Sequence, residues 1–291
     1  MTIHDLLKKT PVLFDGGTGT EFQKRGLKIG DAPESLTLTH KDIVRQVHRD
    51  YLDAGSQVIE TNTFGGNRKR LESAGLANRI VEVNSIAVEI ALQEAGGKAV
   101  VAGSIGPLGV LLEPYGDVSQ TEAMEMFGEQ ASILLRSGIG FILIETMISL
   151  EEATLALRSV KEAGAVSIGV TLTFEMSGDE PRTTFGETAR LCAEVLANEG
   201  ASLVGSNCGN GFEVMRSVSN SMKESSKVPL LIQPNAGIPA YSEGRPVYTE
   251  GPTEFASFVR EMRSAGVDCL GGCCGTTPDH IRSAARVLFG H

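Results

Sequence analysis

The sequence predicts a (β/α)8 barrel, and three observations support this fold. Short apolar runs recur along the chain, and each is followed by a helical pattern, giving eight pairs. The runs are nearly continuous in apolar residues, as expected for parallel strands that are covered on both faces. Finally, the 291 residues are a usual length for a single barrel of this type. We therefore expect one domain that spans residues 1–291.

The predicted elements alternate along the whole chain. The strands are predicted at residues 12–15, 57–61, 99–104, 140–146, 166–173, 202–208, 229–234 and 269–273. The helices are predicted at residues 42–54, 78–95, 121–137, 151–163, 187–199, 211–225, 253–265 and 278–289. Glycines stand just past five of the helical patterns, at Gly55, Gly138, Gly164, Gly200 and Gly266. Glycine adopts the left-handed conformation that ends a helix at little energetic cost.

Two helix starts carry capping signals. Ser149 and Glu152 have the spacing of a capping box, and Thr277 followed by Pro278 fits a capping residue with proline in the first turn. A doubly wound open sheet also alternates strands with helices, and it is the structural alternative to the barrel.

Long connections follow three of the predicted strands, at residues 105–120, 174–186 and 235–252, whereas the connections that follow helices are short. In a barrel, the connections from strand to helix gather at the carboxyl ends of the strands, where active sites are built. We expect these three loops to surround such a site.

Composition and charge restrict the partners. Hydrophobic residues make up 41% of the chain, and the formal net charge is −10 with no long basic run. This balance disfavours nucleic acid or an anionic membrane as the main partner. The amino terminus lacks the apolar core of a signal peptide, and no apolar run approaches the roughly 20 residues that span a bilayer. We expect a cytosolic protein whose cysteines stay reduced, which favours metal or catalytic roles for them.

Three of the five cysteines form a candidate metal site. Cys273 and Cys274 are adjacent within a glycine-rich segment, and a disulfide between neighbours would be strained. Cys208 ends another predicted strand, in a second glycine-rich turn. In a barrel these strand ends meet, so three thiolates could hold Zn²⁺ with one position open. Asn235 ends the intervening strand and is a candidate weak fourth ligand.

The other residue types narrow the chemistry. Cys192 and Cys269 lie in apolar patterns and are predicted to be small buried hydrophobic residues. No histidine ends a predicted strand, so the protein side of the metal site should be all sulfur. No lysine ends one either, which disfavours a Schiff-base aldolase.

The ligand set favours sulfur chemistry. Three thiolates give Zn²⁺ a formal charge of −1, which makes it a weak activator of water. A substrate thiol in the open position would instead be held as a nucleophilic thiolate, able to attack an activated methyl group. Asp15 and Glu145 end two predicted strands and suit a substrate ammonium group, although either alone could be a helix cap or an ion pair. The backbone amides of Gly16, Gly17 and Thr18 suit a carboxylate. The predicted substrate is therefore a small amino acid with a thiol.

Taken together, the motifs resemble the homocysteine S-methyltransferase family over essentially the whole chain. The resemblance is carried by Asp15-Gly16-Gly17-Thr18-Gly19-Thr20, Glu60-Thr61-Asn62-Thr63-Phe64, Gly103-Ser104-Ile105-Gly106-Pro107, Glu145-Thr146, Asn207-Cys208, Pro234-Asn235-Ala236-Gly237 and residues 271–278. It implies a (β/α)8 barrel that methylates homocysteine to methionine.

The resemblance also implies roles for individual residues. Zinc would lie on Cys208, Cys273 and Cys274, while Asp15 and Glu145 match the family's homocysteine-binding acids. The substrate-binding set that we predict is Asp15, Gly16, Gly17, Asn62, Ser104 and Glu145.

The methyl donor is left open by the sequence. Residues 60–64 and 235–237 are most similar to the methionine synthase version of the family, yet we expect the 291 residues to be used up by one barrel, without a folate or cobalamin domain. We expect either a methyl-corrinoid on a separate protein or a small sulfonium such as S-methylmethionine. The absence of tryptophan and the presence of only four tyrosines disfavour a betaine-type donor, which aromatic faces would hold. A thiol acceptor other than homocysteine remains an alternative.

Two further hypotheses keep the barrel. In the first, no metal is bound, and residues 271–277 with the helix start at Pro278 form a phosphate cradle. Such a cradle does not require paired cysteines. In the second, the zinc is purely structural and the protein is not an enzyme, although a barrel of this size does not need zinc to fold.

Overall fold

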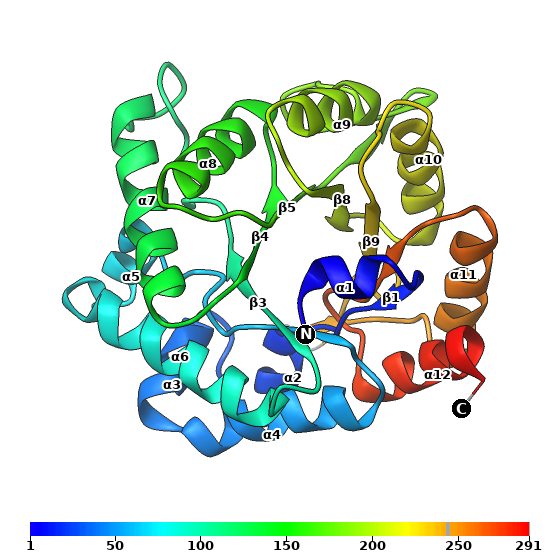
Figure 1. Ribbon diagram of the computed structural model, residues 1–291, viewed down its shortest axis with the longest axis horizontal. Helices are drawn as coiled ribbons and strands as arrows, with labels where there is room; N and C mark the ends of the chain where they lie inside the picture. Colours follow the sequence, from blue (N-terminus) through cyan, green and yellow to red (C-terminus); the bar gives the residue numbers. More distant parts are fainter. Residues whose placement is uncertain (243–244, 291) are drawn as a thin grey trace.

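The computed structural model describes residues 1–242 and 245–290 and shows a barrel of eight parallel strands inside a ring of helices (Figure 1). The barrel strands are β1 (Val12–Leu13), β2 (Val58–Glu60), β3 (Val100–Ile105), β4 (Phe141–Met147), β5 (Ile168–Leu172), β8 (Leu203–Cys208), β9 (Leu230–Pro234) and β12 (Cys269–Leu270). Their near-continuous apolar character is explained by burial on both faces.

The barrel closes between its first and second strands. Around the ring the strands follow the order of the chain, from β1 through β12 back to β2. A parallel bridge between Phe14 and Val58 joins the two ends of this series, and the amide of Gln57 donates to the carbonyl of Leu13 at 2.7 Å. A closed ring in sequence order confirms the (β/α)8 barrel and excludes the doubly wound sheet.

The eight predicted helices are confirmed to within three residues at each end. They are α4 (Lys41–Asp53), α6 (Ile80–Ala95), α7 (Gln120–Arg136), α8 (Leu150–Glu162), α9 (Ala189–Asn198), α10 (Phe212–Lys223), α11 (Pro252–Ser264) and α12 (Pro278–Phe289). All five predicted glycine stops have a positive φ, between 82° and 106°. None of the helices in the described part of the chain is both long and apolar enough to cross a membrane.

The two capping predictions fared differently. Thr277 begins α12 with Pro278 in the first turn, and its amide donates to Nδ1 of His280 at 3.2 Å. Ser149 caps α8 by accepting from the amide of Glu152 at 3.1 Å. The predicted reciprocal contact is absent because Oε1 of Glu152 accepts from the amide of Leu108, at 2.8 Å, in the loop after β3.

Several short elements were not predicted from the sequence. These are α1 (Ile3–Leu7), α2 (Thr18–Lys24), α3 (Leu36–Thr39), α5 (Arg68–Ser73), the 3₁₀ turns η1 (Pro33–Ser35) and η2 (Ala77–Arg79), and the strand pairs β6 (Glu175–Ser177) with β7 (Glu180–Arg182) and β10 (Ala240–Ser242) with β11 (Arg245–Val247). They are too short to produce a recognisable period. The two strand pairs lie in two of the long connections, at residues 174–186 and 235–252.

Helix α1 covers the amino-terminal end of the barrel, where Figure 1 shows it lying across the ring of strands. Ile3 and Leu6 pack into a buried cluster with strand residues such as Val12, Leu231 and Cys269. This end of the barrel is therefore filled by apolar side chains, which leaves the carboxyl ends of the strands to form a site.

Candidate functional site

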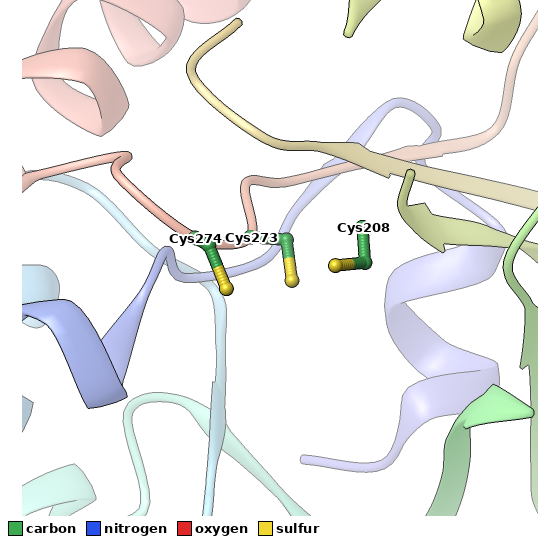
Figure 2. A group of neighbouring side chains, drawn as sticks. All are labelled: Cys208, Cys273 and Cys274. Atoms are coloured by element: carbon green, nitrogen blue, oxygen red, sulfur yellow. The ribbon is translucent and has the colours of Figure 1, made fainter. Parts of the chain in front are cut away.

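Three cysteines meet at the carboxyl end of the barrel. Cys208 is the last residue of β8, and Cys273 and Cys274 lie in the loop between β12 and α12. Their sulfur atoms all lie within 4.8 Å of one another. Figure 2 shows the side chains next to each other, with Cys273 between the other two. The structure thus brings together the three predicted ligands.

The remaining cysteines are separate from this cluster. Cys192 and Cys269 are fully buried, and desolvation raises the pKa of both thiols, that of Cys192 to about 12. They are small hydrophobic residues of the core, as predicted.

Main-chain hydrogen bonds fix the loop that carries two of the cysteines. The amide of Cys273 donates to the carbonyl of Pro234 at 2.8 Å, and the amide of Ala236 donates to the carbonyl of Cys274 at 2.9 Å. The hydroxyl of Thr276 donates to the carbonyl of Cys273 at 2.6 Å. These contacts place the thiols against β9 without help from a ligand.

Cys208 is placed by an unusual backbone conformation. In the described part of the chain, Thr146 and Cys208 are the two non-glycine residues with positive φ, at 61° and 64°. Such conformations are energetically unfavourable and tend to occur at functional sites. Asn207 holds the first of these, because its Oδ1 accepts from the amide of Thr146 at 2.8 Å, and the same oxygen accepts from the hydroxyl of Thr171 at 2.7 Å.

The three thiols share their protons unequally. Hydrogen bonds from Cys273 and Cys274 hold the pKa of Cys208 well below its usual range. The same hydrogen bond to Cys208, as the largest cause for each, raises the pKa of Cys273 and that of Cys274. The cluster therefore favours one thiolate among the three cysteines, with the neighbouring thiols as donors to it.

Asn235 lies beside this cluster. Its Nδ2 donates to the carbonyl of Gly209 at 2.8 Å, and its side chain also hydrogen-bonds to Cys208. Its Oδ1 is buried and has no hydrogen-bond partner. Ligation of a metal by Asn235 stays a prediction.

A cavity of about 280 Å³ opens directly onto the cysteines. It is lined by Gly16, Gly17, Thr18, Gly19, Thr20, Pro33, Glu34, Glu60, Thr61, Asn62, Phe64, Ser104, Glu145, Thr146, Asn207, Cys208, Gln233, Gly272, Cys273 and Cys274. Every residue of the predicted substrate set except Asp15 is therefore part of the wall.

Two predicted residues, Ser104 and Glu145, act as a pair in the wall of the cavity. The hydroxyl of Ser104 donates to Oε1 of Glu145, and Nδ2 of Asn207 donates to Oε2 at 3.3 Å. Glu145 is only 8% exposed, and desolvation raises its pKa. Its carboxyl group is thus oriented from behind and faces the cavity.

Asp15 has a different place from the one expected. It is completely buried and lies behind the wall, where its Oδ2 accepts from the amide of Glu60 at 2.9 Å. Its Oδ1 has no hydrogen-bond partner, and desolvation raises its pKa well above the ordinary value. Glu60, which we had not assigned to the substrate site, lines the cavity in its stead.

The glycine turn after β1 approaches the cysteine loop closely. A Cβ atom on Gly17 would lie 2.6 Å from the carbonyl oxygen of Cys273, so no larger residue fits there. The amide of Gly17 is already used, since it donates to Oγ1 of Thr276 at 3.0 Å. Asn62 is also engaged, because its Nδ2 donates to the carbonyl of Pro33 at 2.8 Å.

The histidines in the described part of the chain lie outside the cysteine cluster. His4 and His48 lie within α1 and α4, His40 precedes α4, and His280 is in the first turn of α12. His291 lies outside the described residues. In the described part of the chain, the cysteine trio is the one group of histidine, cysteine or acidic residues with metal-binding geometry.

The phosphate-cradle hypothesis is weakened by the hydrogen bonding of the loop. A cradle needs free backbone amides. Here six amides of the loop are already hydrogen-bonded. Four donate to backbone carbonyls: Gly271 to Ile232, Gly272 to Asp15, Cys273 to Pro234 and Thr276 to Cys273. Two donate to side chains: Gly275 to Thr20 and Thr277 to His280. Most amides that a phosphate cradle at residues 271–277 would need are therefore already used.

Comparison with known proteins agrees with this geometry. The methionine synthases of Mycobacterium leprae (strain TN) and Mycobacterium tuberculosis (strain ATCC 25618 / H37Rv) are each 30% identical to the chain over 98% of its length. The chain spans only 25% of the length of these relatives.

Solved structures share the fold. The oxidized form of the homocysteine methyltransferase MmuM from Escherichia coli superposes with a TM-score of 0.81 at 22% identity, covering 97% of this chain and 98% of that one. Its metallated form, with the same coverage and identity, gives a TM-score of 0.80. The sequence model of the family described as homocysteine S-methyltransferase matches residues 12–288, which include the whole barrel and every residue of the site. The chain therefore belongs to the homocysteine S-methyltransferase family.

Proposed function

We propose that this protein transfers a methyl group to the thiol of homocysteine and thereby forms methionine. The observation that carries the proposal is the trio of cysteine sulfurs at the end of a cavity that is lined by carboxylates. Family membership and the similarity to methionine synthases support the same reaction.

The cysteine trio fits zinc. Tetrahedral coordination with Zn–S bonds of about 2.3 Å requires sulfur atoms roughly 3.8 Å apart. The sulfur separations of up to 4.8 Å need only small side-chain rotations to reach this value. Cys208, Cys273 and Cys274 would hold the ion, with Asn235 as a candidate weak fourth ligand. When bound there, zinc would lower the pKa of a substrate thiol and keep it as a nucleophilic thiolate.

The chain's own residues orient the acceptor. The carboxylate of Glu145, fixed by Ser104 and Asn207, would receive the substrate ammonium group. The backbone at Gly16 and Thr18, which lines the cavity, would receive the substrate carboxylate. Holding both ends of the amino acid places its thiol at the cysteines, so that proximity supplies much of the acceleration.

The donor is proposed at the level of its chemistry. It carries a methyl group on a good leaving group, either a small sulfonium such as S-methylmethionine or a methyl-corrinoid on a separate protein. We propose that residues 1–291 act as one homocysteine-binding domain. A reducing, cytosolic location is consistent with five free cysteines.

Metal analysis combined with a thiol titration tests the proposal. Protein purified under reducing conditions should contain about one zinc per chain, as expected of a single site with three thiolate ligands. In a cobalt-substituted sample, the thiolate-to-cobalt absorption should grow when homocysteine is added. A cobalt spectrum that is indifferent to homocysteine would support a structural metal instead.

A further inference from the structure

The charged side chains that line the substrate cavity are all acidic. Three glutamates, Glu34, Glu60 and Glu145, line the cavity. Among the described residues of its wall there is no lysine or arginine. Glu34 is engaged elsewhere, since it accepts from the amide of Gly65 at 2.6 Å. Partly buried carboxylates without a side-chain cation are unfavourable, so a cationic group of the ligand would complete the cavity.

Glu60 presents its carboxyl group to this cavity, whereas Asp15 does not. Glu60 is partly exposed and forms part of the wall, while Asp15 has no exposed surface. The carboxyl group of Glu60 accepts from Nε2 of Gln233 at 2.8 Å, and burial together with the negative charge of the neighbouring Glu145 raises its pKa well above the usual range. The side chains of Glu60 and Glu145 therefore lie next to each other on the wall.

Gln233 adds an unsatisfied acceptor to the same wall. Its side chain is 2% exposed and lines the cavity. Because Nε2 donates to Glu60, the amide group is oriented, and its Oε1 is left buried with no hydrogen-bond partner. A buried acceptor of this kind normally has a donor in the functional state of a protein.

We infer that Glu60 and Gln233 join Glu145 to form a three-acceptor cradle for the α-ammonium group of the substrate. An ammonium group has three N–H donors, and the cradle offers one acceptor to each of them. Asp15 is then a positioning residue, which holds the amide of Glu60 from behind the wall. This inference rests on the proposed homocysteine acceptor, and it makes Glu60 the residue that selects thiols carrying an amino group.

Paired substrates provide the test. The Glu60→Gln variant keeps the shape of the side chain but loses its charge. We expect KM for L-homocysteine to rise about 10- to 100-fold, the range for a hydrogen bond to a charged group, with little change in kcat. KM for 4-mercaptobutanoate, which lacks only the amino group, should not change. The Gln233→Met variant should show the same selectivity with a smaller rise, of about 2- to 10-fold.

The Glu152→Gln variant is the matched control, because Glu152 is a buried acid outside the cavity, and it should leave both KM values unchanged. Equal effects of Glu60→Gln on both thiols, or no effect on either, would overturn the cradle and leave Glu60 a structural residue.

A binding measurement separates this inference from the proposed reaction. Calorimetry on zinc-free protein would compare L-methionine with 4-(methylthio)butanoate, which again lacks only the amino group. Tighter binding of L-methionine by the wild type, lost in Glu60→Gln, supports the cradle even if no methyl transfer is found. A wild type that binds L-methionine no better than its des-amino analogue would overturn it, even if homocysteine is methylated.

Discussion

The two ends of the barrel are built from the same strands but filled in opposite ways. At the amino-terminal end, α1 and the strand interiors form an apolar cluster that includes Ile3 and Cys269. At the carboxyl end, β12 is followed by the loop that carries Cys273. The thiols there hydrogen-bond to one another, and the hydroxyl of Ser104 hydrogen-bonds to Glu145. Fully buried side chains occur at both ends, among them Asp15 and Asn207 at the carboxyl end, so burial alone does not distinguish a site from a core. What distinguishes the site is that its polar groups hold one another in place and leave acceptors free.

The largest effect is expected for a cysteine at the carboxyl end, where a substitution should abolish function but not folding. The Cys273→Ser variant should lose bound zinc and more than about 100-fold in turnover, since even groups that only support metal ligands contribute 10- to 100-fold. The barrel should remain folded, because the loop is held by main-chain hydrogen bonds. Metal analysis, kinetics and circular dichroism would check this.

Cys269→Ser is the matched control for that variant. Cys269 is fully buried in the apolar cluster, so a hydroxyl group there should destabilise the fold by about 1 to 3 kcal/mol while zinc stays bound. Retained turnover in a zinc-free Cys273→Ser protein would contradict the proposed mechanism.

A substitution at the other end should affect stability alone. Ile3→Ala removes a side chain that is 2% exposed, so we expect a loss of about 3 kcal/mol in the free energy of unfolding. The metal content and KM for homocysteine should not change. Val166→Ala, at a side chain that is 86% exposed, should change stability by less than about 0.5 kcal/mol. Denaturant unfolding would measure both, and a change in KM for Ile3→Ala would show that the two ends are coupled.

His48 shows what an unsatisfied polar group does away from the site. It is fully buried in α4 with no hydrogen-bond partner for either ring nitrogen, and desolvation lowers its pKa from 6.5 to about 4. Between these two values the unfolded chain binds a proton that the folded protein excludes. The contribution of neutral His48 to the free energy of unfolding is therefore fully present above pH 6.5. It falls by about 3 kcal/mol as the pH drops to 4.

The contribution of His48 can be isolated by replacing it with a residue that does not titrate. His48→Phe should show a shallower fall in unfolding free energy between pH 7 and pH 4 than the wild type. Parallel pH dependences of the two proteins would show that folding does not lower the pKa of His48.

The smallest of the expected effects concerns how the carboxyl end is held together. Asn207→Ala removes the acceptor for the amide of Thr146 and for the hydroxyl of Thr171, which should destabilise the fold by about 2 kcal/mol. KM for homocysteine should also rise, because Glu145 loses a donor. Thr171→Val, which removes one of these contacts, should lower stability less and leave KM unchanged. Equal KM values for Asn207→Ala and the wild type would mean that Glu145 is oriented without Asn207.

The barrel was predictable because its signals are local and repeated. Each helix in the outer ring has an apolar face and a clear end, and glycines such as Gly55 and Gly266 adopt the expected positive φ. Short elements such as α1 and the β6–β7 pair were missed because they depend on contacts with distant segments.

The site was predictable only in part. The cysteines were found because they end a strand, as Cys208 does, or closely follow one, as Cys273 and Cys274 do, and because these strands must converge; their sulfurs do meet. The places of Asp15 and Glu60 were not found, since both follow or end strands and the sequence does not show which carboxyl group reaches the cavity. The register of β1 against β2 decides this, and it buries Asp15 behind the amide of Glu60. Gln233 was missed because a glutamine within an apolar strand gives no functional signal.

The closing contact between β1 and β2 limits how this chain could be rearranged. The two strands are joined by the bridge between Phe14 and Val58, by hydrogen bonds between Leu13 and Gln57, and then by the carboxylate of Asp15 on the amide of Glu60. A circular permutation that places new termini between β1 and β2 would release this seam and displace Glu60 from the cavity. Termini opened in the turn after Gly164, on the opposite side of the ring, would leave the seam intact, so an engineered chain should tolerate that cut far better.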